Sequence, residues 1–559
     1  MPAQDSNYLI IVECKASPAK HESPDRNKPK DYAVDGVLHY SKYLSKEFNV
    51  LSLAVSGEIE SELLVSIFLQ KKGEDIPKEL PDSKLLSVYD CVRLFENENL
   101  NYNLKNVNIV SKAVKLNEDF QKCSVSESMR NTIVSAILLA LQDDVFLASY
   151  TKADSSKNLA TSILSAVKRV LEGAGARKID EMMGEYSKIL NEPIIQEKTI
   201  KKGRTETLVF IKEMIEELRR NILPLTRYEE SGYDILGRFY TEFVRYAASK
   251  QKQGLVLTPA HITDLFCDLA ELRVSDTVYD PCCGTGGFLI AAMKRMLELA
   301  GNNNKLKDNI RSNQLLGVEF RPEMFTFACS NMMMRGDGKS NLDRGDCFDP
   351  TVALRIKSMK PSVSFLNPPY DVGTDGQLHF IEQALDAVRK QNGKAIAIVQ
   401  MSCGLKNNNE TKAVRKRLLE NYTLKAVISM PDQLFYPIGV VTCIMVFDSS
   451  APNKGKKTWF GYMKDDGFIL RKNRGRIDQN SKWDEIKGRV LDSYFNGDEI
   501  PGLSVRKEIT EKDEWCAEAY MKTDYSELKE SDFKRNIQNY IAFNLRKDYI
   551  EFNGDDEFD

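Results

Sequence analysis

The spacing of apolar positions changes along the chain, and each change predicts a different kind of structure. Residues 8–12 and 49–55 are short apolar runs on either side of a helix-like stretch at residues 31–48, which predicts a strand, a helix and a second strand. From about residue 120 to 250, apolar residues recur at helical spacing and predict a helical bundle. Beyond residue 250, apolar runs alternate with helical stretches.

That alternation, over residues 251–450, predicts a doubly wound, mostly parallel α/β sheet of the Rossmann-like type. Strands are expected at residues 277–279, 315–320, 363–366, 394–399, 424–429 and 442–447. Helices are expected between most of them, including residues 288–299 and 321–334. Ligands bind such sheets at the carboxyl ends of the strands, so the residues that follow the strands are the candidates for a site.

We therefore divide the chain into four units, namely residues 1–115, a small α/β domain; 116–250, a helical domain; 251–450, the doubly wound sheet; and 451–559, a carboxyl-terminal extension. The extension mixes aromatic with basic residues. Its aromatic residues include Trp459, Phe460, Tyr462, Phe468 and Trp483. This mixture suits a nucleic acid groove and an ordinary β-rich surface equally well.

Composition narrows the class of protein. With 559 residues, 42% of them hydrophobic, the chain can form several cores. A net charge of -3 argues against nonspecific coating of nucleic acid, so any DNA contact is focused or shared with a partner. Eleven cysteines without a CxxC pair and only four histidines favour neither a disulfide framework nor a structural metal site. No apolar run reaches the length of a membrane span and no signal peptide is recognisable, so a cytoplasmic protein is expected.

The strongest chemical candidate is the end of the apolar run at residues 363–366. There the chain continues as Asn367, Pro368, a second proline and Tyr370. Neither proline can donate to a sheet, so the strand stops and leaves the Asn367 side chain at the carboxyl edge. An amide can accept from a substrate NH2 group, and a tyrosine ring can stack on a flat ring.

Other candidates follow neighbouring strands. Residues 280–288, Asp-Pro-Cys-Cys-Gly-Thr-Gly-Gly-Phe, lie between a strand and a helix, as a nucleotide-binding glycine turn does, and Asp280 can take a ligand's amine. The spacing is not GxGxxG and no GK[ST] follows, which disfavours a dinucleotide or ATP. Glu319 can accept both hydroxyls of a ribose, Phe320 can pack on an adenine, and Asp346 can accept from an adenine amino group.

The ordered set resembles the DNA methyltransferases that methylate amino groups, and within them the adenine-N6 methylating subunit of type I restriction-modification systems. The resemblance covers roughly residues 120–480. Residues 233–240 and 257–259 look like the entry into the catalytic domain, and residues 280–288 look like the cofactor loop. Residues 433–442 are similar to the stretch that closes the target pocket, where Phe435 would face the base.

The resemblance implies S-adenosylmethionine as cofactor, double-stranded DNA as substrate and an adenine turned out of the duplex. The residues that it places at the cofactor are Thr258, Asp280, Gly284, Gly286, Glu319 and Asp346. Those that it places at the base are Asn367, Pro368 and Tyr370. Methyl transfer of this kind requires neither a metal nor a covalent intermediate.

Glu13 and Lys15 follow the first apolar run and share one face of the predicted strand. They resemble the second half of a PD-(D/E)xK nuclease site, as in the amino-terminal nuclease domain of type I restriction subunits, where the acid holds Mg2+. That family also uses an aspartate on an earlier strand, and Asp5 is the only upstream carboxylate. We expect a nuclease-like domain that is truncated or inactive, with Mg2+ needed only if it is active. The alternative is an exposed acid–base pair of little energetic value.

Several alternatives remain at this point. The Asn-Pro-Pro-Tyr loop also suits methylation of another planar nitrogen, such as protein glutamine or RNA guanine. Two further alternatives are that the chain combines a methylase with a nuclease, and that it is a non-catalytic DNA-binding scaffold. No long segment after Phe447 must be a target-recognition domain. The resemblance implies that a separate specificity subunit reads the target, docked on the tail from about Pro501, with a restriction subunit as a further partner.

Overall fold

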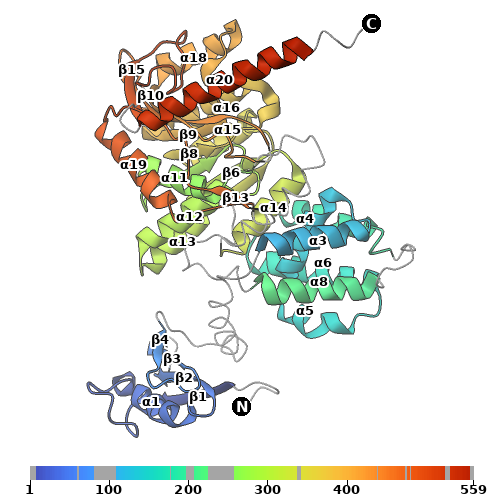
Figure 1. Ribbon diagram of the computed structural model, residues 1–559. Helices are drawn as coiled ribbons and strands as arrows, with labels where there is room; N and C mark the ends of the chain where they lie inside the picture. The colour runs from blue at the N-terminus through green and yellow to red at the C-terminus, as the bar shows by residue number, and fades with distance from the viewer. Residues whose placement is uncertain are drawn as a thin grey trace. The chain divides into compact units, whose positions relative to one another are not determined.

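The computed structural model of the chain is shown in Figure 1. It describes residues 8–58, 62–80, 109–176, 178–196, 207–223, 257–336, 341–436, 438–471, 475–478, 480–522 and 529–553. The chain forms two compact units, residues 1–108 and residues 109–559. Each unit is described by itself.

The amino-terminal unit is a four-stranded sheet in the order β1, β2, β3, β4. The strands are β1 (Tyr8–Lys15), β2 (Asn49–Ser56), β3 (Leu64–Gln70) and β4 (Lys78–Leu80). β1 and β2 are parallel and the other pairs are antiparallel. A short turn, η1 (Pro18–Lys20), precedes α1 (Ala33–Leu44), which joins the parallel strands and buries its apolar face against Ala54 and Phe68. The predicted strand, helix and strand are confirmed.

The second unit begins with helices. They are α3 (Ile109–Lys122), α4 (Glu127–Ala140), α5 (Asp144–Ser149), η3 (Tyr150–Lys152), α6 (Ser156–Gly173), α7 (Ile179–Ser187), η4 (Lys188–Asn191) and α8 (Thr207–Asn221). The helix predicted around residues 235–246 and the matched stretch 233–240 lie outside the described residues. Tyr186 of α7 is fully buried and bonds through its hydroxyl to Ser135 of α4 at 2.8 Å and to Ser330 of the sheet domain. The helical region therefore packs on the sheet domain that follows.

That domain is built on a nine-stranded sheet in the order β15, β12, β10, β11, β9, β8, β5, β6, β7. The strands are β5 (Val278–Asp280), β6 (Leu315–Glu319), β7 (Asn341–Arg344), β8 (Val363–Leu366), β9 (Lys394–Gln400), β10 (Thr423–Ser429), β11 (Thr442–Asp448), β12 (Lys457–Tyr462) and β15 (Ser504–Glu508). β11 and β15 run antiparallel to their neighbours and the remaining pairs are parallel. The predicted doubly wound, mostly parallel sheet is confirmed.

Helices connect the strands and cover the sheet (Figure 1). They are α11 (Ala260–Ala270), α12 (Gly287–Ala300), α13 (Asn304–Asn313), α14 (Pro322–Met333), α15 (Pro350–Ser358), α16 (Gly373–Val388), α17 (Ser402–Leu405), α18 (Asn409–Asn421) and α19 (Trp483–Asn496), with short turns η6 (Tyr370–Val372) and η7 (Arg389–Gln391). The rings of Phe266, Phe288 and Phe365 pack between α11, α12 and β8, with centroids 4.5 to 5.9 Å apart. This core places the first turns of α11 and α12 beside the end of β8.

Part of the sheet was not foreseen. The prediction omitted β7, and it did not assign β12 or β15 to this sheet, although both follow residue 450. A small hairpin of β13 (Ile469–Arg471) and β14 (Gly475–Ile477) lies between β12 and α19 in the chain. The polar stretch between α12 and β6 forms the additional helix α13.

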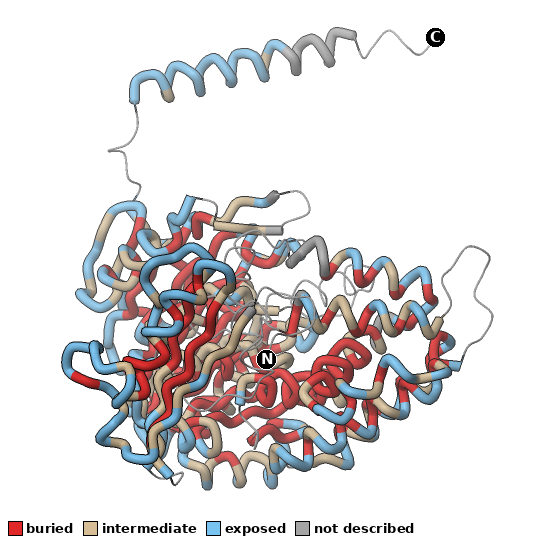
Figure 2. The backbone as a smooth tube through the Cα atoms, turned by 90° about the horizontal axis from the view of Figure 1, so that it is seen from below, coloured by how far each residue is buried: buried red, intermediate tan, exposed pale blue. Residues whose placement is uncertain are grey.

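The last described helix, α20 (Glu530–Asn553), exposes most of its described side chains, and Figure 2 shows it largely in pale blue. The large apolar side chains that it exposes are Phe533, Ile537, Tyr540, Ile541, Phe543 and Leu545. A helix with this composition is not stabilised by burial of its own apolar face in this chain.

Among the described residues, no single helix is long and apolar enough to cross a membrane. One pair of helices, Met129–Ala140 with Asp144–Lys152, passes by length and composition together, but it bends by 93°.

Candidate functional site

A cavity of about 980 Å³ lies at the carboxyl ends of β5, β6 and β8. The strand order reverses between β5 and β8, because the chain runs from β5 outward to β6 and β7 and then returns to β8 on the other side. Doubly wound sheets open a crevice at such a reversal. The predicted site residues that line the cavity are Thr258, Asp280, Gly284, Glu319, Phe320, Asp346, Asn367 and Pro368. Gly286, Tyr370 and Phe435 lie beside it without lining it.

Asn367 directly follows β8, and its side chain bonds to Thr258, two residues before α11. The amide nitrogen Nδ2 donates to the hydroxyl Oγ1 of Thr258 at 3.0 Å. Because this bond engages the amide nitrogen, it fixes the orientation of the amide group and therefore the position of its oxygen. Thr258, which the resemblance places at the cofactor, therefore also contacts the residue expected to hold the base.

Tyr370 and Phe435 form an aromatic pair next to Asn367. Their ring centroids are 6.2 Å apart and the rings stand at 86° to one another. Phe435 is buried, and burial raises the pKa of the Tyr370 hydroxyl well above its ordinary value.

Two of the carboxyl groups that line the cavity, those of Asp280 and Glu319, are buried. Asp280 is 1% exposed and its Oδ1 accepts from the backbone nitrogen of Cys282 at 3.0 Å. Burial raises the pKa of Asp280 to about 8, with a smaller contribution from the charge of Glu319. Glu319 accepts from the backbone nitrogens of Gly284 and Arg321, each at 2.8 Å, and burial raises its pKa as well. Carboxyl groups that are short of solvent favour a ligand that brings hydrogen-bond donors.

The turn after β5 depends on two glycines. Gly284 has φ of +53° and Gly286 has φ of +83°, a region that residues with side chains rarely adopt. A Cβ on Gly284 would point into open space, so the backbone of this turn is exposed to the cavity. Gly286 caps the amino end of α12.

The far end of the cavity, beyond β6 and β7, contains Phe320 and Asp346. Phe320 is 73% exposed and is free to pack on a ligand ring. Oδ1 of Asp346 accepts from the backbone nitrogen of Phe348 at 2.9 Å, and the ring of Phe348 meets that of Phe380 edge to face at 4.9 Å. An aromatic floor beside a carboxylate suits a purine-like group.

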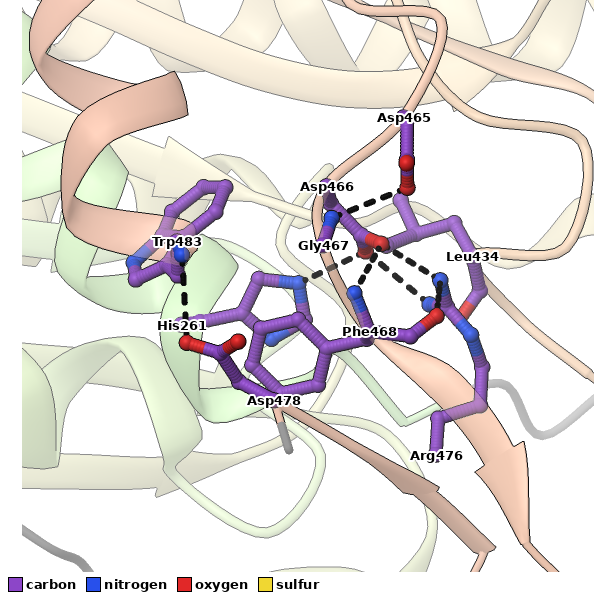
Figure 3. Close-up of polar contacts among 9 residues, drawn as sticks. All are labelled: His261, Leu434, Asp465, Asp466, Gly467, Phe468, Arg476, Asp478 and Trp483. Carbon is purple, nitrogen blue, oxygen red and sulfur yellow. Dashed lines mark hydrogen bonds and ion pairs between the residues drawn. The ribbon is translucent and has the colours of Figure 1, made fainter. Parts of the chain in front are cut away.

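The opposite wall was missed by the sequence analysis (Figure 3). It is formed by the His261 cluster, which we define as His261, Asp466, Phe468, Arg476 and Trp483. Nε2 of His261 lies 3.1 Å from Oδ2 of Asp466, whose carboxylate is fully buried and also accepts from Arg476 at 2.6 and 3.0 Å. The aromatic residues of the extension were noted in the sequence, but only the fold brings them to α11.

Glu13 and Lys15 lie in the amino-terminal unit and contact one another. Nζ of Lys15 donates to Oε1 of Glu13 at 3.0 Å and to the backbone oxygen of Lys30 at 2.9 Å. Both side chains are partly buried, and Asp5 lies outside the described residues. In the described ranges, no group of three or more His, Cys, Asp or Glu side chains is placed to hold a metal ion.

A doubly wound sheet with a cavity at its switch point is the architecture in which α/β proteins place their ligand sites. Comparison with known proteins then shows the family. The chain belongs to the N-6 DNA methylase family, whose model matches residues 231–548. It is therefore a DNA methyltransferase by family.

Two relatives illustrate the family. The type II restriction enzyme and methyltransferase RM.BcgI of Heyndrickxia coagulans is 33% identical over 96% of this chain and 88% of its own length. The type I restriction enzyme MjaVIII methylase subunit of Methanocaldococcus jannaschii is 23% identical over 58% of this chain, and the match spans 56% of that subunit. A solved chain from a study of assembly and conformational transition in a type I R-M system shares the fold, with a TM-score of 0.50 and 17% identity over 79% of this chain and 98% of that one.

Proposed function

We propose that the chain is a site-specific adenine-N6 DNA methyltransferase that uses S-adenosylmethionine and serves as the modification subunit of a restriction-modification system. The observation that carries this proposal is the position of Asn367. It ends β8 within the same cavity as Asp280 and Glu319, and its amide is oriented by Thr258.

The order of the strands supports the proposed place of each part of the cofactor in the cavity. Glu319 and Asp346 follow β6 and β7, and are suited to a ribose and an adenine respectively. Asn367 follows β8, on the other side of β5. S-adenosylmethionine, when bound, supplies a methyl group on a positively charged sulfur. To bring that methyl group to Asn367, the cofactor must cross the end of β5, where Asp280 and the backbone of Gly284 line the cavity.

Asn367 and Pro368 make the target amine reactive. The lone pair of an adenine amino group is conjugated with its ring, so the nitrogen is a poor nucleophile until it moves toward tetrahedral geometry. The side-chain oxygen of Asn367 and the backbone oxygen of Pro368 can accept from its two N–H groups and favour that geometry. Tyr370 stacks on the extruded base, and Phe435, whose ring stands edge to face with that of Tyr370, completes the base pocket.

The test is the substitution Asn367→Ala, assayed for transfer of labelled methyl groups to DNA and for binding of S-adenosylhomocysteine by calorimetry. Transfer should fall at least a thousandfold while cofactor binding changes by less than about threefold, because Asn367 acts on the base. Asn304→Ala, at the exposed start of α13, is the matched control and should resemble the unaltered chain. Transfer that persists in Asn367→Ala would remove the basis of the proposal.

The same assay separates the alternatives. Nucleoside analysis of the labelled product would identify a methylated adenine. Label in protein glutamine or RNA guanine would indicate another planar nitrogen as the substrate. A chain that binds no S-adenosylhomocysteine would be a DNA-binding scaffold.

The partners are double-stranded DNA and a separate specificity subunit, with a restriction subunit as a further member of the complex. The exposed apolar side chains of α20, including Ile537 and Ile541, are suited to docking the specificity subunit. Methylation should therefore be weak with the isolated chain and strong when the specificity subunit is added. Equally strong site-specific methylation without that subunit would contradict this assignment.

A second candidate activity, DNA cleavage with Mg2+, concerns Glu13 and Lys15. The relative from Heyndrickxia coagulans is named as both a restriction enzyme and a methyltransferase, which is consistent with the alternative of a combined methylase and nuclease. Glu13 is engaged by Lys15, and its described surroundings supply no further cluster of metal ligands. We therefore retain the hypothesis of a nuclease-like domain that does not cleave and contributes contacts to DNA or a partner.

A further inference from the structure

We propose that His261, presented by the His261 cluster, binds the α-ammonium group of the methyl donor's amino-acid end. This inference rests on the proposed function, because it takes S-adenosylmethionine as the ligand of the cavity. It assigns a binding role to a wall of the cavity formed by α11 and by residues 468, 476–478, 483 and 484, which none of the expected cofactor residues occupies.

The location follows from the strand order. If the ribose and adenine lie over β6 and β7, and the methyl group meets Asn367 at β8, the sulfur lies near the end of β5. The amino-acid chain then continues from the sulfur away from β6, toward Thr258 and the first turn of α11. His261 lies on that turn and lines the cavity.

One of the two ring nitrogens of His261, Nδ1, is left as a hydrogen-bond acceptor. Burial lowers the pKa of the His261 imidazole below its ordinary value, so the ring is neutral near pH 7. Asp466 is ionised, because its contacts with His261 and Arg476 lower its pKa despite burial, and an ionised carboxylate can only accept. The proton of the imidazole must therefore be on Nε2, which donates to Asp466 at 3.1 Å. Nδ1 is then a lone-pair acceptor, and within the described part of the chain it makes no hydrogen bond.

The position of the ring is fixed on both sides. Phe468 stacks on His261 with centroids 4.0 Å apart and planes at 17°, and Trp483 meets it edge to face at 4.8 Å. The His261 side chain is only 9% exposed. An acceptor held in this way loses little entropy when a donor binds to it.

Ion pairs join α19, which begins with Trp483, to α11. Nζ of Lys487, on α19, lies 3.2 Å from Asp264 and 3.0 Å from Asp268, and both of these carboxylates also pair with Arg295 of α12. The ion pairs connect α19 to both helices that border the cavity. These ion pairs therefore help to hold Phe468 and Trp483 in position at the cavity.

The ligand chemistry that fits is a primary ammonium. It offers three N–H donors, of which Nδ1 of His261 can accept one and Asp280 another. A carboxylate at the same place would oppose the lone pair of Nδ1. The carboxylate of an amino acid instead suits the free N–H groups at the start of α11, beside Pro259.

Two substitutions separate the roles of the two imidazole nitrogens. In His261→Gln, the side-chain amide nitrogen takes the place of Nε2 and can still donate to Asp466, but the acceptor at Nδ1 is lost. In His261→Asn, the side-chain oxygen takes the place of Nδ1 and keeps the acceptor, while the bond to Asp466 is lost. His379→Ala, on the outer face of α16 beside Glu382, is the control.

The measurement is calorimetric binding of two probes to the full chain, namely S-adenosylhomocysteine, which has the amino-acid end, and 5′-methylthioadenosine, which lacks it. His261→Gln should weaken S-adenosylhomocysteine binding on the order of 10- to 100-fold, as for loss of a hydrogen bond to a charged group. His261→Asn should weaken it by less than about fivefold, and neither should change 5′-methylthioadenosine binding by more than twofold. Thermal unfolding of each variant checks that it is folded.

Three results would overturn the inference: His261→Gln binds S-adenosylhomocysteine as well as the unaltered chain, it loses both probes equally, or His261→Asn is affected as much as His261→Gln. A failure of the proposed function looks different. In that case the unaltered chain itself would bind neither probe.

Discussion

Thr258 offers a sharp test of how the site is arranged, because it contacts Asn367 and also lines the cofactor cavity. Thr258→Val keeps the shape of the side chain and removes the hydroxyl that accepts from Asn367 Nδ2 at 3.0 Å. Loss of one hydrogen bond, with the amide left to rotate, costs about 1 to 2 kcal/mol. If this cost falls on the transition state, the rate of methyl transfer drops roughly 5- to 30-fold.

The assay is single-turnover methyl transfer to DNA by the chain with its specificity subunit, beside calorimetric binding of S-adenosylhomocysteine. Thr258→Val should slow transfer and leave binding within about threefold, since Thr258 acts through Asn367. Thr258→Ser retains the hydroxyl and should restore the rate. If Thr258→Val instead weakens binding tenfold and leaves the single-turnover rate unchanged, Thr258 serves the cofactor and does not orient the amide.

Three further predictions concern other parts of the chain. Asp280 has a pKa of about 8 in the folded chain against an ordinary 3.8. As pH rises from about 4 to 8, the carboxyl group is therefore ionised in the unfolded chain while it still holds its proton in the folded chain. The free energy of unfolding falls over this range. In calorimetric scans without ligand, Asp280→Asn should be more stable than the unaltered chain at pH 8, by up to about 5 kcal/mol. At pH 4 the two should be nearly equally stable. Equal stability at both pH values would contradict the raised pKa of Asp280. Gly317→Ala should cost about 1 to 3 kcal/mol in urea unfolding, because its Cβ would lie 2.5 Å from Leu342 Cδ2 and 3.0 Å from both Cys283 Sγ and Leu289 Cδ1, and unchanged stability would show that the core yields. DNA incubated with the chain and Mg2+ should stay intact, and cleavage that disappears in Glu13→Ala would show an active nuclease.

The sheet was predictable where strands are apolar throughout. β8 and β9 are buried on both faces, so their apolar runs gave the bounds to within a residue. β7 was missed because Asn341, Asp343 and Arg344 interrupt its pattern, although Asn341 and Asp343 are buried. β15 is a mostly exposed edge strand with several charged residues, and no apolar pattern marks it.

The site was predictable where its residues follow a strand directly. Asp280, Glu319 and Asn367 stand at or next to strand ends, and a parallel sheet brings such residues together whatever the loops do. His261 and Asp466 could not be paired from the sequence, because no local pattern links residues that are 205 positions apart. Only the position of the β13–β14 hairpin over α11 shows that they belong to one cavity.

That separation has a consequence for synthesis of the protein. One side of the cavity includes residues 257–261 and 263, and the opposite side includes residues 468, 476–478, 483 and 484, so the pocket stays open on the ribosome until almost nine-tenths of the chain has emerged. Contacts of such long range form late in folding. An incomplete chain would carry the Asn-Pro-Pro-Tyr loop and the glycine turn without an enclosed pocket. If His261 binds the methyl donor as proposed, that binding requires the chain to have been synthesised as far as Trp483.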